Sequence, residues 1–341
     1  MRPLVSILIP AYNAERWIAE SVQSAMSQTW PDKEVIVVND GSTDRTAEVL
    51  RGFATKNVKI VSTENRGAAA ARNHALALCQ GEFIQWLDAD DLLAPNKIER
   101  QLVEFRQMEN DRILLSGPWA HFYHRISRAR FLPNQLWADL RPVEWLIRKM
   151  DEHLHMQTAT WLTSRTLAKA AGPWNPRMIT DDDGEYFCRV LVASDGTRFV
   201  PDAHVYYRIV SSHRVSYVGH SKIKQEALLG SIKFHINCIR SLENSERTRR
   251  ACLSYLQYYV SDFYPERPDI VAELQTLAAL LDGRVTIPIL RRKYDWLRPV
   301  LGYSIAKWAQ VALPMLKTSL AIAWDKLLYQ LETGSPTPPS Q

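Results

Sequence analysis

Asp88, Asp90 and Asp91 are the densest group of side chains in the sequence that could do chemistry. They follow directly on the apolar run at residues 83–87, which has the composition of a buried strand. Because side chains alternate along an extended chain, we expect Asp88 and Asp90 to point to one side of the strand end. Paired carboxylates suit a hard divalent cation such as Mg²⁺, which binds oxygen ligands. The alternative is an acidic turn that caps the next helix.

A second acidic cluster consists of Asp181, Asp182, Asp183 and Glu185, and an apolar pattern of helical spacing follows it. The positive end of a helix dipole favours carboxylates in the first turn. Capping alone would therefore explain one or two of these four acids.

The elements that must position these acids alternate between strand and helix. Four such pairs in about the first hundred residues predict a doubly wound, mainly parallel α/β sheet. Ligands bind beyond the carboxyl ends of such strands, where three polar loops are expected, at residues 10–13, 39–42 and 88–91. The predicted strands are 5–9, 35–38, 59–62 and 83–92, and the predicted helices are 14–26, 44–53, 68–79 and 95–108, with Gly81 closing the third helix.

The later sequence is less regular and then becomes helical. We expect a domain boundary near Tyr217, with a helical region at 218–332 and a disordered tail rich in Pro and Ser at 333–341. Most of the tryptophans between residues 119 and 174 are expected to pack in the core. The predicted strands are 113–115, 158–162, 199–200 and 205–208, and the predicted helices are 142–150, 223–242, 248–263 and 270–281.

Composition restricts the class of protein. A chain of 341 residues with 46% hydrophobic and 23% charged residues is that of a globular protein with one large domain and a smaller one. The four cysteines are scattered, which favours neither a zinc site nor a disulfide framework and predicts a reducing compartment. No signal peptide opens the chain, so a cytoplasmic protein is expected.

The net charge of +5 is mild, and basic residues near the end of the chain are interleaved with tryptophans. This favours a membrane surface over nucleic acid as a partner. Two interpretations of one apolar stripe stay open: a helix lying on the cytoplasmic membrane face, or a helix packed on the first domain. The stripe consists of Leu297, Val300, Leu301, Ile305, Trp308 and Ala312, with Arg298 and Lys307 nearby.

Four segments in order, at residues 5–13, 37–44, 71–73 and 87–91, together resemble the family 2 glycosyltransferases. Each motif is weak alone, but their order and spacing are specific. The resemblance continues through 171–175 and 182–189, and so covers roughly residues 5–216. It implies a GT-A (Rossmann-like) fold in a nucleotide-sugar-binding and catalytic domain at residues 1–217. It also implies transfer of a sugar from a nucleotide-sugar to an acceptor hydroxyl, with inversion at the anomeric carbon.

The resemblance also implies roles for residues that would hold the donor. Pro10, Tyr12, Asn13 and Asp40 would bind the base and ribose, Tyr12 by ring contact and Asp40 by accepting hydrogen bonds from the base. Asp88 would bind the ribose. A UDP-sugar is the expected donor, and a glycan or lipid-linked molecule the expected acceptor.

The metal and phosphate roles follow in the same way. Asp90 would bind a divalent cation, Mn²⁺ or Mg²⁺, and Asp91 would start the next turn. Arg72 would reach the donor phosphates, or would pair with a carboxylate on its own helix. In relatives with a third metal ligand this ligand is a late histidine, and His204 and His213 are the candidates.

Asp183 occupies the position of the catalytic base in the family, Asp182 a supporting position, and Asp181 the loop. We therefore predict an inverting glycosyltransferase of a cell-surface polysaccharide or glycolipid pathway. A nucleotidyltransferase that makes sugar nucleotides is one alternative, although residues 10–13 lack the glycine-rich, basic phosphate loop of such enzymes. A non-catalytic sugar-nucleotide-binding protein is the other.

Overall fold

The computed structural model describes residues 2–108, 110–211, 221–288, 290, 292–296 and 298–334. The predicted domain boundary near Tyr217 lies outside these residues. Of the predicted disordered tail, Thr333 ends a helix, and residues 335–341 lie outside the described part.

A five-stranded sheet forms the centre of the fold, in the order β3-β2-β1-β4-β9. Its first four strands are parallel and the short last one is antiparallel. The strand side chains of β1 are buried on both faces, as expected for a parallel sheet covered on two sides. This confirms the predicted mainly parallel sheet. The strands are β1 (Val5–Ala11), β2 (Lys33–Asp40), β3 (Val58–Thr63), β4 (Phe83–Trp86) and β9 (Thr163–Ser164).

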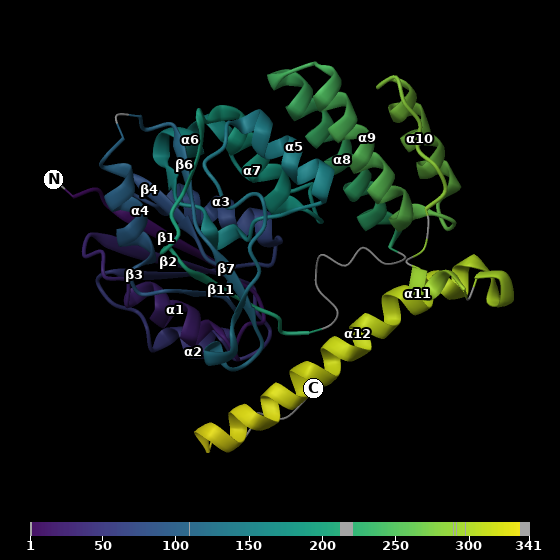
Figure 1. The fold of residues 1–341 in the computed structure, drawn as a ribbon. Helices are drawn as coiled ribbons and strands as arrows, with labels where there is room; N and C mark the ends of the chain where they lie inside the picture. Colours follow the sequence, from purple (N-terminus) through teal and green to yellow (C-terminus); the bar gives the residue numbers. More distant parts are fainter. Residues whose placement is uncertain are drawn as a thin grey trace.

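The connections explain where a ligand would bind. From β1 the chain moves outward to β2 and β3, and α1 (Ile18–Met26) and α2 (Thr46–Arg51) lie together on one face of the sheet. The chain then crosses back through α3 (Ala68–Leu78), on the other face, to place β4 on the opposite side of β1 (Figure 1). Right-handed crossovers require this change of face. The strand order therefore reverses between β1 and β4, where such folds bind ligands.

Two smaller sheets continue this layer. One has the order β5-β11-β7-β8 and the other pairs β6 with β10. β4 is shorter than the strand predicted at 83–92, since it ends at Trp86, and the acids lie in a turn before β5, where a polar loop at 88–91 was expected. The elements are β5 (Leu92–Leu93), β6 (Ile113–Ser116), β7 (Trp119–Phe122), β8 (Arg130–Phe131), β10 (Gly196–Phe199), β11 (Val205–Arg208), η1 (Ile126–Arg128), α4 (Lys97–Phe105), α5 (Pro142–Glu152), α6 (Arg165–Ala171) and α7 (Asp182–Ala193).

The predicted strand at 158–162 is also wrong. Residues Thr158–Thr160 form a 3₁₀ turn, η2, instead. The Gln157 side chain accepts a hydrogen bond from the Ala159 amide at 2.6 Å, and the Thr160 hydroxyl donates to the Gln157 carbonyl at 2.6 Å. Such local side-chain bonds give the backbone an alternative to a strand ladder.

The helical region packs directly on the first domain. α8 (Lys222–Leu242) lies against α7, and α9 (Glu246–Phe263) lies against α5 and α10 (Pro268–Ala279). Their buried apolar side chains continue the core of the sheet domain. α11 (Arg292–Asp295) and α12 (Arg298–Thr333) follow. α12 is kinked at Gly302, whose φ is 80°, and its longer part runs past the first domain (Figure 1). None of the described helices combines the length and the apolar character needed to cross a bilayer.

Gly81 has a different role from the predicted helix cap. α3 already ends at Leu78, and a Cβ on Gly81 would lie 2.5 Å from the Ser6 amide nitrogen on β1. We expect Gly81→Ala to lower the free energy of unfolding by about 1–3 kcal/mol, because the backbones of β1 and β4 would have to separate. Gly52→Ala is the matched control, since its Cβ would meet nothing closer than 3.6 Å. Urea unfolding measures both, and equal midpoints for the two variants would contradict the close approach.

Candidate active site

A cleft of about 1090 Å³ opens where the chain leaves β4. Both predicted acidic clusters line it: Asp88 and Asp90 on one side, and Asp181, Asp182 and Asp183 at the start of α7 on the other. Residues 90 positions apart in the sequence are thus brought into one site, as the resemblance implies. Arg72, His155, Gln157, Thr158, Tyr207 and Arg208 complete this end of the cleft.

Asp91 holds the acidic turn in place. It is fully buried, and its carboxylate accepts hydrogen bonds from the Arg208 amide at 2.8 Å and from the Gln157 side chain at 2.5 Å. Burial and the neighbouring Asp90 and Asp88 raise the pKa of Asp91 well above its usual value. Asp91 was expected only to start the next turn. It also connects the acidic turn to β11 and to the loop before η2.

Asp90 presents its carboxylate to the cleft. Among the described residues no other residue donates a hydrogen bond to its carboxylate, while its carbonyl accepts one from Arg208 Nε at 2.9 Å. Burial and repulsion from Asp88 raise the pKa of Asp90 to about 6, which a hydrogen bond from its own backbone and the charge of Arg208 partly oppose. Two adjacent carboxylates, of which Asp90 has no partner on another described residue, fit a divalent cation.

Few protein groups would complete such a cation site. No cluster of three His, Cys, Asp or Glu side chains suited to a metal occurs in the part of the chain that the structure describes. Two carboxylates with remaining positions left for water and phosphate oxygens are a donor set typical of Mg²⁺. His204 packs its ring on Phe131, with centroids 4.8 Å apart, and does not line the cleft. His213 lies outside the described residues.

Arg72 joins the two acidic clusters. Its guanidinium donates to Asp88 at 3.0 Å and to Asp182 at 2.5 Å, and it stacks over the Trp174 ring at 4.4 Å. The arginine is nearly buried, with 7% of its surface exposed. Of the two predicted roles, the structure shows pairing with carboxylates, although these come from the β4 turn and α7 and not from α3 itself.

Asp183 lies in the first turn of α7 and faces the cleft. The Thr158 hydroxyl donates to its carboxylate at 3.3 Å. Burial, followed by repulsion from Asp182 and Asp181, raises the pKa of Asp183 to about 7, against the attraction of Arg72. A carboxyl with this pKa can accept a proton near neutral pH, which is what a general base requires.

Asp181 has a structural role beyond the loop. Its φ of 55° lies in the left-handed region, and its carboxylate accepts a hydrogen bond from the Ser231 hydroxyl at 2.5 Å. The buried His235 ring lies 3.7 Å from the same carboxylate. Ser231 and His235 belong to α8, so the helical region helps to fix the start of α7 and with it Asp183.

The predicted donor-binding residues lie at the ends of β1 and β2. Pro10 lies near the end of β1, and Tyr12, half exposed, follows it in the loop. The Asn13 side chain accepts a hydrogen bond from the Thr43 amide at 2.8 Å, which ties this loop to the loop after β2. Asp40 is buried, and its carboxylate accepts from the amides of Arg66 and Gly67 at 2.9 and 2.8 Å. Their roles toward a base and ribose stay predictions.

Sequence reasoning missed Arg208, Gln157 and Thr158. Arg208 is buried, pairs with Glu20 at 2.7 Å, and lies over the ring of Trp17 at 4.3 Å. In the sequence it is the last residue of a short predicted strand, and an arginine there is ordinary. The one sequence signal for a buried guanidinium was that Arg208 follows three apolar or aromatic residues.

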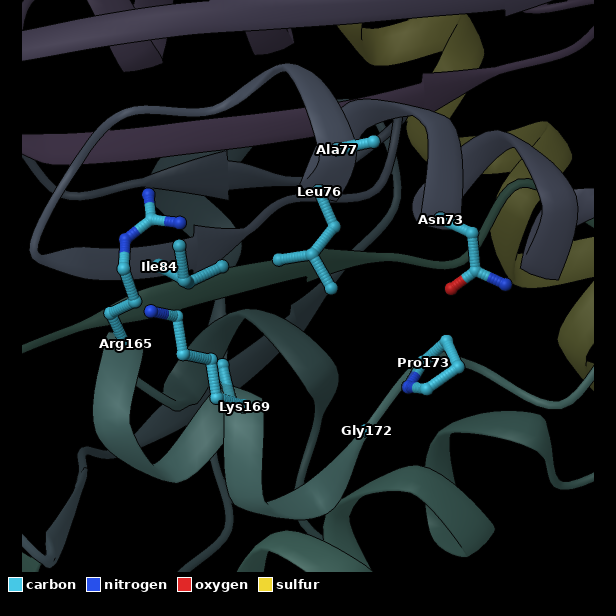
Figure 2. A pocket seen from close by; sticks show the side chains of 9 residues that line it. Asn73, Leu76, Ala77, Ile84, Arg165, Lys169, Gly172 and Pro173 are labelled. Carbon is cyan, nitrogen blue, oxygen red and sulfur yellow. The ribbon is translucent and has the colours of Figure 1, made fainter.

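A smaller pocket of about 350 Å³ lies between α3 and α6, where Leu76 and Ile84 point inward (Figure 2). Arg165 and Lys169 lie at one side of it, and Asn73 and Pro173 at the other (Figure 2). Its lining includes no carboxylate. Asn73 exchanges two hydrogen bonds of 2.8 Å with the Trp174 backbone, and so fixes the ring on which Arg72 rests.

Comparison with known proteins agrees with this geometry. Residues 6–152 match the family model for glycosyl transferase family 2. Over 107 residues the chain is 45% identical to the chondroitin synthase of Escherichia coli, a match that covers 31% of this chain and 16% of that protein. Over 113 residues it is 39% identical to an uncharacterized glycosyltransferase of Rickettsia typhi, covering 33% and 35%. The matched stretch is thus about a third or less of these two relatives.

The solved structure of S. aureus TarS 1-349 in complex with UDP-GlcNAc covers 90% of this chain and 88% of its own, with a TM-score of 0.66 and 19% identity. This likeness extends past the family match into the helical region and shows a shared fold. The predicted α/β sheet of GT-A type, followed by helices, is confirmed. The stretch at residues 6–152 therefore matches glycosyl transferase family 2, in agreement with the motifs at residues 5–13, 37–44, 71–73 and 87–91.

Proposed function

We propose that this protein is an inverting, metal-dependent glycosyltransferase that moves a sugar from a UDP-sugar to an acceptor hydroxyl in the synthesis of a cell-surface polysaccharide or glycolipid. One observation carries the proposal: Asp88 and Asp90 share a single cleft with Asp183, whose pKa is raised to about 7. Similarity to a chondroitin synthase, and the fold of TarS in complex with UDP-GlcNAc, support a UDP-sugar donor.

The donor would bind across the ends of β1, β2 and β4. Tyr12 offers an exposed ring to the base, and Asp40, although bonded to two amides, retains lone pairs for the base edge. Asp88, held by Arg72, would accept hydrogen bonds from the ribose. When bound at Asp90, a divalent cation neutralises the charge that develops on the leaving diphosphate.

Asp183 would act on the acceptor side of the sugar. Its carboxylate takes the proton of the attacking hydroxyl, and attack opposite the leaving group inverts the anomeric carbon. A positioned base typically accelerates such a step by about 10²–10⁴-fold. Arg72, which pairs with Asp182, attracts the ionised base and so partly offsets its repulsion from Asp182 and Asp181.

We further propose that α12 attaches the enzyme to an anionic membrane surface. Of the apolar stripe considered above, Val300, Leu301, Ile305 and Trp308 are exposed, so they do not pack on the catalytic domain. Ala312 is half-buried and Leu297 lies outside the described residues. A more regular face follows in the second half of α12, at the three- and four-residue spacing of one helix side. This outer face consists of Leu313, Leu316, Leu320, Trp324, Leu327 and Leu331, each between 46% and 74% exposed.

The charges of α12 divide between its two sides. Asp325 and Glu332 turn inward, where both pair with Arg125 at 2.8 and 2.6 Å. Lys317 and Lys326 form no salt bridge among the described residues, and Lys317 lies within the apolar outer face by helical spacing. Lys317 is exposed, whereas Lys326 is half-buried and close to His124. An amphipathic helix with an outward lysine and a tryptophan suits an anionic bilayer surface.

Asp183→Asn should lower transfer by at least about 10²-fold while leaving UDP binding intact, because only the proton acceptor is lost. Asp90→Ala should instead weaken the Mn²⁺-dependent part of UDP-sugar binding. UDP release from a panel of sugar nucleotides with Mn²⁺, together with thermal shift, measures both. Asp195→Asn, which alters an exposed acid outside the cleft, is the control. Near-normal turnover of Asp183→Asn would refute the base, and no thermal shift with any sugar nucleotide would refute the function.

The pH profile should report the same carboxyl. With the pKa of Asp183 at about 7, kcat/KM should fall about tenfold per pH unit below 7, as the base becomes protonated, and level off above. Thr158→Val removes a hydrogen bond that favours the ionised form, so its profile should move to higher pH. UDP release between pH 5 and 9 tests this, and a rate independent of pH would contradict it.

Membrane attachment is tested by co-sedimentation of the full chain with vesicles of phosphatidylcholine and phosphatidylglycerol in equal amounts. Leu320→Gln combined with Trp324→Gln should weaken binding at least about tenfold, because two apolar side chains no longer enter the interface. Val103→Gln, an equally apolar exposed position on α4, should not change binding. Equal binding by all variants, or equal binding to phosphatidylcholine alone, would count against the outer face.

A further inference from the structure

The cleft continues well beyond the acids of the donor site. Its other end is lined by Tyr258, Tyr259 and Asp262 of α9, by Glu266, and by α12. At about 1090 Å³ it reaches the upper end of the volumes that small-molecule sites usually have. The far end therefore offers space for a second molecule next to the donor. α12 contributes Ser304, Lys307, Trp308 and Val311.

Two aromatic rings border this far end. Trp308 is 68% exposed and makes no ring contact with a described residue. Tyr258 is 47% exposed, and His153 supports its ring by stacking at 3.9 Å. When a ligand packs on an exposed aromatic ring, it removes apolar surface from water, which is favourable. The C–H face of a sugar ring can pack on an aromatic ring in this way.

Asp262 adds a hydrogen-bond acceptor to these rings. It follows Tyr258 by four residues on α9, so the two side chains share one side of the helix. Among the described residues, its carboxylate forms no hydrogen bond. The surrounding protein raises the pKa of Asp262 to about 6 by desolvation, which Lys307 opposes. An ionised carboxylate accepts hydrogen bonds and suits the hydroxyls of a sugar.

The charges of the cleft select against an anionic acceptor. Acidic side chains outnumber arginines and lysines along its lining, and each of these cations already has an acidic partner. Arg72 pairs with Asp88 and Asp182, Arg208 with Glu20, and Lys307 with Glu266 at 2.7 Å. A uronic acid or a phosphate at the far end would meet carboxylates without a free arginine or lysine among the described lining residues.

We propose that Trp308, Tyr258 and Asp262 form the acceptor subsite, and that it takes an uncharged sugar ring. The proposal rests on the proposed function and adds the class of acceptor and the residues that would select it. Trp308 would cover one face of the ring, and Asp262 would accept hydrogen bonds from its hydroxyls. The reacting hydroxyl would then extend toward Asp183 in the same cleft.

Saturation-transfer NMR on the full chain, with UDP and Mn²⁺ at saturation, tests the subsite. The probes are the methyl β-glycosides of glucose, galactose, mannose and N-acetylglucosamine, and methyl β-glucuronide as the anionic counterpart. At least one neutral glycoside should give a signal that UDP does not displace, and the glucuronide should give none. Trp308→Ala and Asp262→Asn should weaken this binding about three- to tenfold, as expected for one aromatic or hydrogen-bonded contact.

Trp296→Ala is the matched control, because Trp296 is similarly exposed, at 65%, but does not line the cleft. Equal signals from Trp308→Ala and Trp296→Ala would overturn the subsite, as would the absence of any glycoside signal. Binding of the glucuronide as strong as that of the neutral glycosides would overturn the charge selection. A thermal shift by UDP in every variant separates these outcomes from a failure of the proposed function, in which UDP would shift none of them.

Discussion

The bridge made by Arg72 is the interaction on which the rest of the site depends. One guanidinium holds Asp88 after β4 and Asp182 at the start of α7, and these carboxylates would otherwise only repel each other. Removing one partner of a buried charged pair commonly costs about 3–5 kcal/mol, because the remaining charges are left unpaired in a poorly solvated place. The bridge therefore fixes the distance between the acids for the donor and the acid for the acceptor.

Three packed aromatic rings support the Arg72 guanidinium, which contacts one of them. Arg72 rests on Trp174, whose ring stacks on Tyr186 with centroids 4.1 Å apart, and Trp86 meets both rings edge-on. Trp86 ends β4 and Tyr186 belongs to α7, so the same two elements that carry the acids also meet in the core. Apolar packing and the ion pairs thus constrain the same geometry. The raised pKa values of Asp90 and Asp183 show that ionising these two carboxyls costs free energy in this place, and the packing holds them there.

Sequence pattern predicted the parts of this arrangement that depend on local periodicity. β1 to β4, their crossover helices, α5 and α7 to α10 follow from runs of apolar residues at strand or helix spacing, whereas α6 was not predicted. The prediction failed at η2, where hydrogen bonds of the Gln157 side chain stabilise a 3₁₀ turn in place of a strand. It also failed at β4, which ends in a turn before its apolar run is complete. The pattern predicted a helical stripe only at residues 297–312 and did not extend it through the second half of α12, because Lys307 and Pro314 interrupt the apolar pattern.

The partners of charged residues were beyond sequence reasoning for a different reason. Arg72 and Asp182 are 110 positions apart, and nothing in either neighbourhood indicates the other. The same holds for Asp91 and Arg208, which are 117 positions apart, although the Arg208 amide donates to the Asp91 carboxylate at 2.8 Å. Motifs identified the individual acids. The charged partners that determine whether each acid is ionised could be recognised only in the folded structure.

The two attachments of α12 have a mechanical consequence. Lys307 binds Tyr264 and Glu266 in the helical region, and Asp325 binds Arg125 in the sheet domain. The eighteen residue steps from Lys307 to Asp325 span about 27 Å of helix, so α12 connects the helical region to the sheet domain. The Arg125–Asp325 pair is the more enclosed, with 10% of each side chain exposed against 18% and 33% for Lys307 and Glu266. Solvent screens the Lys307–Glu266 pair more. If the helical region and the sheet domain separate, we therefore expect this pair to break first, while the Arg125–Asp325 pair keeps α12 attached to the sheet domain.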